Sequence, residues 1–361
     1  TEGAAAANYF IAQAAETVML MLDIGGGTTD VALWFDGKPL WRDSYRIAGG
    51  DFFTTYLANN PEVLRHIGLD EVVSGLTGRS DLGDMSRSDY VELYVNKPEF
   101  SERFGKNFGL LATEPIGRGL EQVAATALGG LMFYVGIVVS RLLADPTTPI
   151  KEANLSRMTV AFAGRGSTLF RQMSTGGEDD LLSSLVSIML ASAGFQPEDV
   201  KVKLRFSGPT EAKHEVAKGL LIDRKVAGER EESRLTVLGE DLVVTEGGVE
   251  RRVSATNALS SIKSVDIIDE LEMKQFNNFL VSLRKLAGLQ IDVHSRDAID
   301  SIRAKARQRL SDAIRNLDED AFDVIDAQPF EPPFITALRE LISLMAKPLE
   351  QRDAELVVRE S

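Results

Sequence analysis

Residues 22–31 read LDIGGGTTDV, with three consecutive glycines between two aspartates. The apolar run at residues 18–22 leads into them and is typical of a strand buried on both faces. Because glycine has no side chain and adopts positive φ angles, the backbone after Asp23 can approach an anion closely. Successive amides in such a turn form a concave site for phosphate oxygens. The segment predicts a strand ending in an anion-binding turn, with a glycine-rich hairpin turn that binds nothing as the alternative.

The polar side chains of this turn suit a metal–phosphate ligand. Thr28 can donate its hydroxyl to a terminal phosphate. Asp23 and Asp30 can hold Mg²⁺ through its water shell, which this ion gives up reluctantly. The metal is needed because two carboxylates beside a triphosphate would otherwise repel it. We therefore expect Asp23 and Asp30 as metal-holding and catalytic residues, and the phosphate contacts from Gly25, Gly26, Gly27, Thr28 and Thr29.

The flanking sequence predicts an α/β protein with a largely central sheet, because strand and helix patterns alternate. The expected helices are at residues 3–16, from Gly49-Gly50-Asp51 onward with Asp51 as N-cap, at 119–143, from near Thr168 and at 214–221. The expected strands are at residues 18–22, 29–35, 39–47, 158–163 and 200–206, with a hairpin turn at Asp36-Gly37. A second glycine turn, Gly164-Arg165-Gly166-Ser167, is expected between the strand at 158–163 and its helix.

Beyond about residue 227 the composition changes. Residues 234–253 contain two β-rich runs separated by Glu246-Gly247-Gly248, which predicts a hairpin. Residues 267–286 and 295–317 have helical spacing of apolar positions, and a last helix is expected at 334–345. We therefore expect a mostly helical C-terminal extension that carries one β-hairpin.

Composition excludes several classes of function. The 54 acidic and 40 basic residues give a net charge of −14, which opposes a general grip on nucleic acid or anionic lipid. The absence of cysteine excludes disulfides, thiol nucleophiles and cysteine metal sites. A length of 361 residues fits two domains. These features indicate a globular cytoplasmic protein.

One segment leaves a membrane span as an alternative. Residues 123–139 carry no charge, but they are at the short limit for crossing a bilayer and contain three glycines. We expect a helix buried within the protein, and no membrane partner. The chain begins at Thr1 without a signal-peptide pattern, and we expect that sequence upstream of it is missing.

Residues 23–30 resemble the second phosphate motif of the superfamily that joins heat-shock chaperone ATPase domains, actin and sugar kinases. The resemblance implies an actin-like (ribonuclease H-like) ATPase lobe, closest to the chaperone and actin branch, with ATP and Mg²⁺ as cofactors. Residues 49–52 resemble the chaperone pattern after the hairpin, where we expect a structural role. Residues 163–168 resemble the adenosine motif, which implies nucleoside contacts from Gly164, Arg165, Gly166 and Ser167.

Two more segments resemble the connecting motifs of this superfamily. Residues 1–6 resemble the end of the first, which implies that Glu2 orients the attacking water, although Gly3 replaces the usual proline. Residues 215–220 resemble the second, a short helix at the hinge between lobes. Arg165 stands where family members often have glycine, so its side chain could stack on the base, obstruct it or point to solvent.

The resemblance implies a division into two parts. Residues 1–228 match the second lobe, with an inserted helical subdomain at about 51–115, and residues 229–361 form the extension. No first phosphate motif precedes Glu2, so we expect a fragment whose partner is the missing first lobe. Since the nucleotide binds between lobes, this fragment alone should bind ATP weakly and hardly hydrolyse it.

Two functions remain open from the sequence. The first is a nucleotide-dependent conformational switch, an ATPase in the full-length protein, that passes its motion to a protein partner. The second is a degenerate, non-catalytic actin-like fold that serves as a scaffold and binds proteins through residues 230–361. Arg165 and Gly3 favour the scaffold, whereas Asp23, Thr28 and Asp30 favour the switch.

Overall fold

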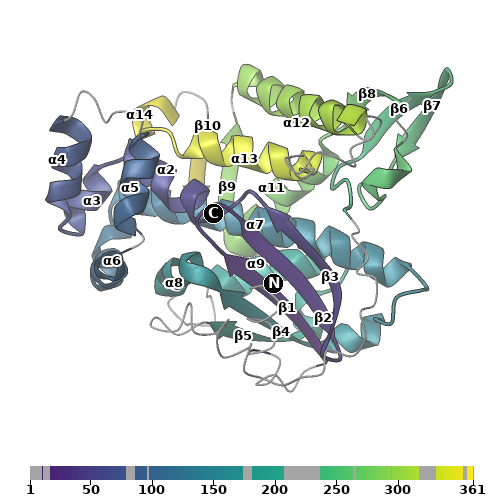
Figure 1. Cartoon of the computed structure of the whole chain (residues 1–361), viewed down its shortest axis with the longest axis horizontal. Helices are drawn as coiled ribbons and strands as arrows, with labels where there is room; N and C mark the ends of the chain where they lie inside the picture. Colours follow the sequence, from purple (N-terminus) through teal and green to yellow (C-terminus); the bar gives the residue numbers. More distant parts are fainter. Residues whose placement is uncertain are drawn as a thin grey trace.

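The computed structural model describes residues 10, 17–78, 86–95, 97–173, 181–206, 236–262, 266–293, 295–316, 331–352 and 356–360. Within these residues the chain has a mixed α/β structure (Figure 1). Glu2, the helix expected at residues 3–16 apart from Phe10, and the motif at 215–220 lie outside the described residues.

A five-stranded sheet in the order β3-β2-β1-β4-β5 confirms the expected α/β class. β1 (Val18–Ile24), β2 (Thr29–Phe35) and β3 (Lys38–Tyr45) form an antiparallel meander. β4 (Arg157–Ala163) runs parallel to β1, and β5 (Lys201–Phe206) runs parallel to β4. The carboxyl ends of β1 and β4 therefore lie at the same edge of the sheet.

The two faces of the sheet are covered differently. Alternate residues of β1 point to opposite faces, so Leu20, Leu22 and Ile24 join the main core, while Met19 and Met21 pack with Phe10. The main core contains α7 (Pro115–Ala144) and α9 (Leu181–Ser192), which lie behind the sheet in Figure 1.

α7 is the helix that the sequence left open as a membrane span. Among the described residues it alone is long and apolar enough to cross a bilayer, yet 94% of its most apolar window is buried inside the protein. Tyr134 of α7 meets Tyr45 of β3 with ring centroids 5.3 Å apart, and Phe133 stacks on Phe334 at 5.4 Å. The helix forms the centre of the core, as expected.

Between β3 and α7 the described residues are mostly helical. The elements are η1 (Gly50–Thr54, a π-helical turn), α2 (Thr55–Asn59), α3 (Glu62–His66), α4 (Asp70–Gly78), α5 (Arg87–Val95) and α6 (Pro98–Leu111). Phe104 of α6 stacks on Phe100 and meets Phe53 of η1. Phe53 in turn meets Phe170 of α8 (Gly164–Met173), so aromatic contacts tie these helices to the sheet domain.

The C-terminal part contains more β structure than the single expected hairpin. β6 (Leu242–Glu246) and β7 (Val249–Val253) form that hairpin, and β8 (Ile267–Leu271) adds a third strand beside β6. β9 (Leu289–Val293) and β10 (Leu356–Glu360) form a separate antiparallel pair. The other elements are η2 (Glu152–Ser156), η3 (Pro197–Asp199), η4 (Leu259–Ser261), α11 (Lys274–Ala287), α12 (Arg296–Asn316), α13 (Pro333–Met345) and α14 (Leu349–Arg352).

The helix expected at residues 267–286 is therefore wrong in its first third. Ile268 and Leu271 are both buried and three residues apart, which is a helical spacing. They share one face of a strand because the pairing register shifts: Val244 opposes Ile268 while Val243 opposes Glu270. The bulge at Asp269 adds the residue that brings both apolar side chains inward.

Candidate functional site

The loop between β1 and β2 brings the two aspartates of the glycine-rich segment together. Asp23 and Asp30 are direct partners across the antiparallel pair, so their side chains share one face. Opposed Cβ atoms in such pairs are about 4.5–5.5 Å apart. The loop is closed by a hydrogen bond of 2.9 Å from the Gly25 amide to the Thr28 carbonyl. Asp30 is exposed and Asp23 is half-buried.

Gly49 and Gly50 hold this loop in its shape. Their amides donate to the carbonyl oxygens of Gly25 and Gly26 at 3.0 and 2.9 Å. An added Cβ would lie 3.1 Å from the Gly25 oxygen at position 49 and 2.8 Å from the Gly26 oxygen at position 50. The close approach therefore requires glycine at position 50, whereas a Cβ at position 49 would press on the Gly25 oxygen and require a shift of a few tenths of an ångström.

This contact also fixes the direction of the loop amides. In a trans peptide the C=O and the following N–H point in opposite directions. Since the Gly25 and Gly26 oxygens face Gly49 and Gly50, the amides of Gly26 and Gly27 point away from that contact. Within the described part of the chain, the amides of Gly26, Gly27 and Thr28 donate to no acceptor, and these three residues are exposed. Consecutive free amides of this kind suit an anionic ligand.

The start of α8 reaches the same edge of the sheet. Ala163, the last residue of β4, is the parallel partner of Asp23. Gly164 has a φ of +77°, and an added Cβ there would lie 2.4 Å from Asp23 Oδ1 and 2.4 Å from the Ile24 carbonyl oxygen. Gly166 packs as closely on Ile24, where an added Cβ would lie 2.5 Å from Cγ2. The positive end of the α8 dipole thus lies beside the Asp23 carboxylate.

The expected glycine turn at residues 164–167 is wrong, because α8 begins at Gly164 itself. The positive φ of Gly164 makes the whole change of direction, so no further turn residues are needed. Ser167 is buried and donates its hydroxyl to the Gly164 carbonyl at 2.7 Å. Its side chain is used inside the helix, and the side chain of Arg165 lies outside the described set.

Two further expectations are corrected at this edge. Thr29 is fully buried and donates its hydroxyl to the Ile47 carbonyl at 2.5 Å, so its side chain holds β2 to the segment before Gly49. Asp51 is not an N-cap, because the helix after β3 starts at Gly50 with Gly49 before it. The glycine pair leaves no room at position 49 or 50 for a capping side chain.

Sequence reasoning missed two side chains at the site. Ser44 of β3 donates its hydroxyl to Asp30 Oδ1 at 2.6 Å. Glu92 of α5 reaches the loop from the helical region: an added Cβ on Gly26 would lie 2.9 Å from its Oε1. A strand alternation could have placed Ser44 opposite Asp30, whereas no sequence signal connects Glu92 to Gly26.

The site therefore unites Asp23, Gly25, Gly26, Gly27, Thr28, Asp30, Gly164 and Gly166, with Gly49 and Gly50 as supports. Two opposed carboxylates fit Mg²⁺ held through its waters, since this ion is commonly bound by one or two carboxylates together with phosphate oxygens. In the described ranges no group of three or more His, Cys, Asp or Glu forms a direct metal cage.

No protein-family model matches the chain, and no curated protein is significantly similar to it. The site offers backbone amides for an anion, two carboxylates for a hydrated cation, and a helix start beside them.

Proposed function

We propose that this chain binds the phosphates of Mg-ATP at the β1–β2 loop, as the second lobe of an actin-like ATPase that works as a nucleotide-dependent conformational switch. The observation that carries this proposal is the pair of hydrogen bonds from Gly49 and Gly50, which turns the amides of Gly26 and Gly27 outward. A hairpin turn without a ligand has no need of this arrangement, because its amides can point anywhere in solvent.

The sheet order supports the finer fold assignment. An antiparallel meander of three strands is followed by β4, parallel to β1, and β5, parallel to β4, and this mixed sheet is compatible with the proposed actin-like (ribonuclease H-like) lobe. In such a lobe the ligand lies at the edge where β1 and β4 end, next to the following loops and helix starts. The glycine loop and α8 both begin at that edge.

Each group has a distinct role in the proposed complex. The amides of Gly26 and Gly27 and the hydroxyl of Thr28 bind phosphate oxygens, and Asp23 and Asp30 hold the Mg²⁺ waters. Gly164 and Gly166 let the start of α8 pack against Asp23 and Ile24, which brings the α8 backbone to the edge where the nucleoside would lie. The metal, when bound, offsets the charge of the polyphosphate against the two carboxylates. Glu2, to which the resemblance gives the positioning of water, lies outside the described residues.

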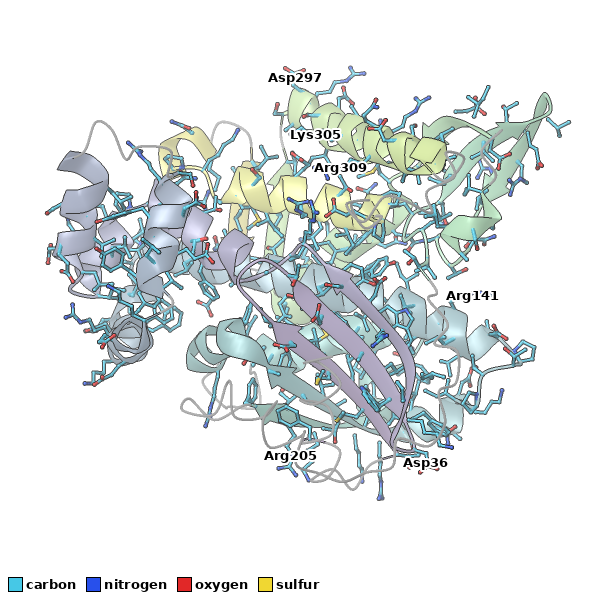
Figure 2. All side chains as sticks on the ribbon, viewed as in Figure 1. Asp36, Arg141, Arg205, Asp297, Lys305 and Arg309 are labelled. Atoms are coloured by element: carbon cyan, nitrogen blue, oxygen red, sulfur yellow. The ribbon has the colours of Figure 1, made fainter. Side chains whose placement is uncertain are left out.

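Calorimetric titration of the 361-residue chain with ATP tests this function. We expect Asp30→Asn to weaken Mg-ATP binding roughly 10-fold, because the carboxylate acts through the metal. In EDTA the variant should bind ATP as well as the wild type or slightly better, because without the metal the Asp30 charge only repels the polyphosphate. Asp36→Asn is the matched control, since Asp36 is exposed at the far tip of the same hairpin (Figure 2). Equal Mg-ATP affinity for the wild type and Asp30→Asn, or no binding by the wild type, would end the proposal.

A second candidate is a non-catalytic scaffold that binds a protein through residues 230–361. It is favoured by the apolar side chains that the β6–β8 sheet leaves exposed, Val249 at 69% and Ile267 at 65%. Exposed apolar side chains are a feature of binding surfaces when they gather into patches. The same titration separates the two functions, because a scaffold gives no Mg-dependent heat with ATP.

A further inference from the structure

Ser44, Asp30 and Asp23 lie in one row across the sheet. Asp30 of β2 is the register partner of Asp23 on β1 and of Ser44 on β3. Residues directly opposed in antiparallel strands point to the same face. The row therefore places the Ser44 hydroxyl next to the Asp30 carboxylate, on the side of Asp30 opposite to Asp23 and β4.

The Ser44 hydroxyl donates to Asp30 Oδ1 over 2.6 Å, a length typical of a hydroxyl bound to a carboxylate. An exposed aspartate without such a donor turns freely about its side-chain torsions. One hydrogen bond to Oδ1 restricts the orientation of the carboxylate and leaves Oδ2 for a second partner.

The backbone that carries Ser44 is itself held in place. Asp43 Oδ1 accepts the Ser44 amide at 2.9 Å, and Asp43 Oδ2 accepts the hydroxyl of Tyr45 at 2.9 Å. Tyr45 is buried against Tyr134 of α7. The hydroxyl of Ser44 is thus presented from an ordered strand end.

We propose that Ser44 is a positioning residue that holds the Asp30 carboxylate in the orientation needed to bind the water shell of a nucleotide-bound Mg²⁺. This inference rests on the proposed function and adds a residue to it. Ser44 touches neither nucleotide nor metal, and acts through Asp30. Its removal should therefore affect the Mg²⁺-dependent part of binding and nothing else.

The test compares the wild type with Ser44→Ala and Ser44→Thr by titrating ATP at several Mg²⁺ concentrations and in EDTA. We expect Ser44→Ala to raise the Mg²⁺ concentration for half-maximal enhancement of ATP binding roughly 3- to 10-fold, with unchanged affinity in EDTA and unchanged Tm. Ser44→Thr keeps the hydroxyl and suits a strand, so it should retain the wild-type Mg²⁺ dependence. In an Asp30→Asn background, Ser44→Ala should add no further loss.

The outcomes are distinct. A wild-type chain that shows no Mg²⁺-dependent ATP binding overturns the proposed function together with this inference. A wild type that binds Mg-ATP and a Ser44→Ala variant with the same Mg²⁺ dependence overturns the role of Ser44 alone. Equal losses with Mg²⁺ and with EDTA would show general damage to the loop, and would also refute a role through Asp30.

Discussion

Gly50 donates its backbone amide to the carbonyl oxygen of Gly26 at 2.9 Å, which joins the helix start after β3 to the loop after β1. These residues are brought together only because β1, β2 and β3 form a meander that returns the chain to the same edge. The contact leaves the amide of Gly27 directed outward, where the proposed phosphate lies.

Replacing Gly50 by alanine should therefore damage both the fold and the site. The new Cβ would stand 2.8 Å from the Gly26 carbonyl oxygen, so the hydrogen bond must lengthen or break. Forcing an extra methyl group into a packed contact costs about 1–3 kcal/mol. We expect a loss of this size in the free energy of unfolding, measured by urea denaturation.

Gly27→Ala is the control for this prediction, because an added Cβ at position 27 meets nothing within 4 Å. Its stability should equal that of the wild type. If Gly50→Ala were as stable as Gly27→Ala, the close approach of the two glycine segments would be wrong.

The local sequence was sufficient to predict the five strands of the main sheet and the glycine loop after β1. The signals that predict them are local in sequence. They are the glycines between apolar runs, the hairpin signal at Asp36-Gly37 and the second buried run at residues 158–163. The side chains that complete the site come from afar. Glu92 is placed by the packing of α5 on the helices after β3, which no periodicity in its own helix encodes.

The wrong or missing predictions also come from features that the local sequence does not encode. Gly164 replaces a whole turn with one positive φ, so the sequence suggested a longer connection than the fold uses. The bulge in β8 imitates helical spacing. β9 and β10 are five-residue strands that pair across α12 and α13, and short strands stabilised only by a distant partner carry little local signal.

Removing the charge of Glu92 should strengthen the binding of a polyphosphate. Its carboxylate lies beside Gly26, where a negative charge opposes an incoming phosphate. We expect Glu92→Gln to tighten Mg-ATP binding about 2- to 5-fold in calorimetry at low salt, with the gain shrinking as salt is added. Glu99→Gln makes the same charge change at an exposed position on α6 and should have a smaller effect. A weaker affinity for Glu92→Gln would mean that this carboxylate binds the ligand instead of repelling it.

Glu240 should make the stability of the C-terminal part depend on pH. Its carboxylate accepts the backbone amides of Gln275 and Phe276 at the start of α11. Burial nevertheless raises the pKa of the Glu240 carboxyl from 4.5 to about 8. Between about pH 4.5 and pH 8 the folded protein keeps a proton that the unfolded chain releases. The free energy of unfolding therefore falls as the pH rises, by up to about 1.4 kcal/mol per pH unit.

Glu240→Gln isolates this contribution, because the amide side chain does not titrate. The variant loses one acceptor for the α11 amides, so its stability at a single pH is not the readout. We expect the free energy of unfolding of the wild type, relative to that of Glu240→Gln, to be higher at pH 5.5 than at pH 8. Denaturation of both proteins at the two pH values measures it. A difference that stays constant across this range would contradict the raised pKa.

The packing of α7 on α9 should be highly sensitive to added volume. An added Cβ at Gly136 would lie 1.8 Å from Ser192 Oγ and 2.3 Å from the Met189 carbonyl oxygen. The Ser192 hydroxyl already donates to the Phe133 carbonyl at 2.8 Å, so it cannot turn away without losing that bond. Because helix backbone must move, Gly136→Ala should cost several kcal/mol, at or beyond the upper end of the roughly 1–3 kcal/mol typical of overpacking.

Gly109→Ala is the matched control on α6, where nothing lies within 4 Å and alanine favours the helix by about 1 kcal/mol. Thermal unfolding should therefore move in opposite directions for the two variants, and a Gly136→Ala protein as stable as the wild type would show that α7 and α9 do not approach this closely.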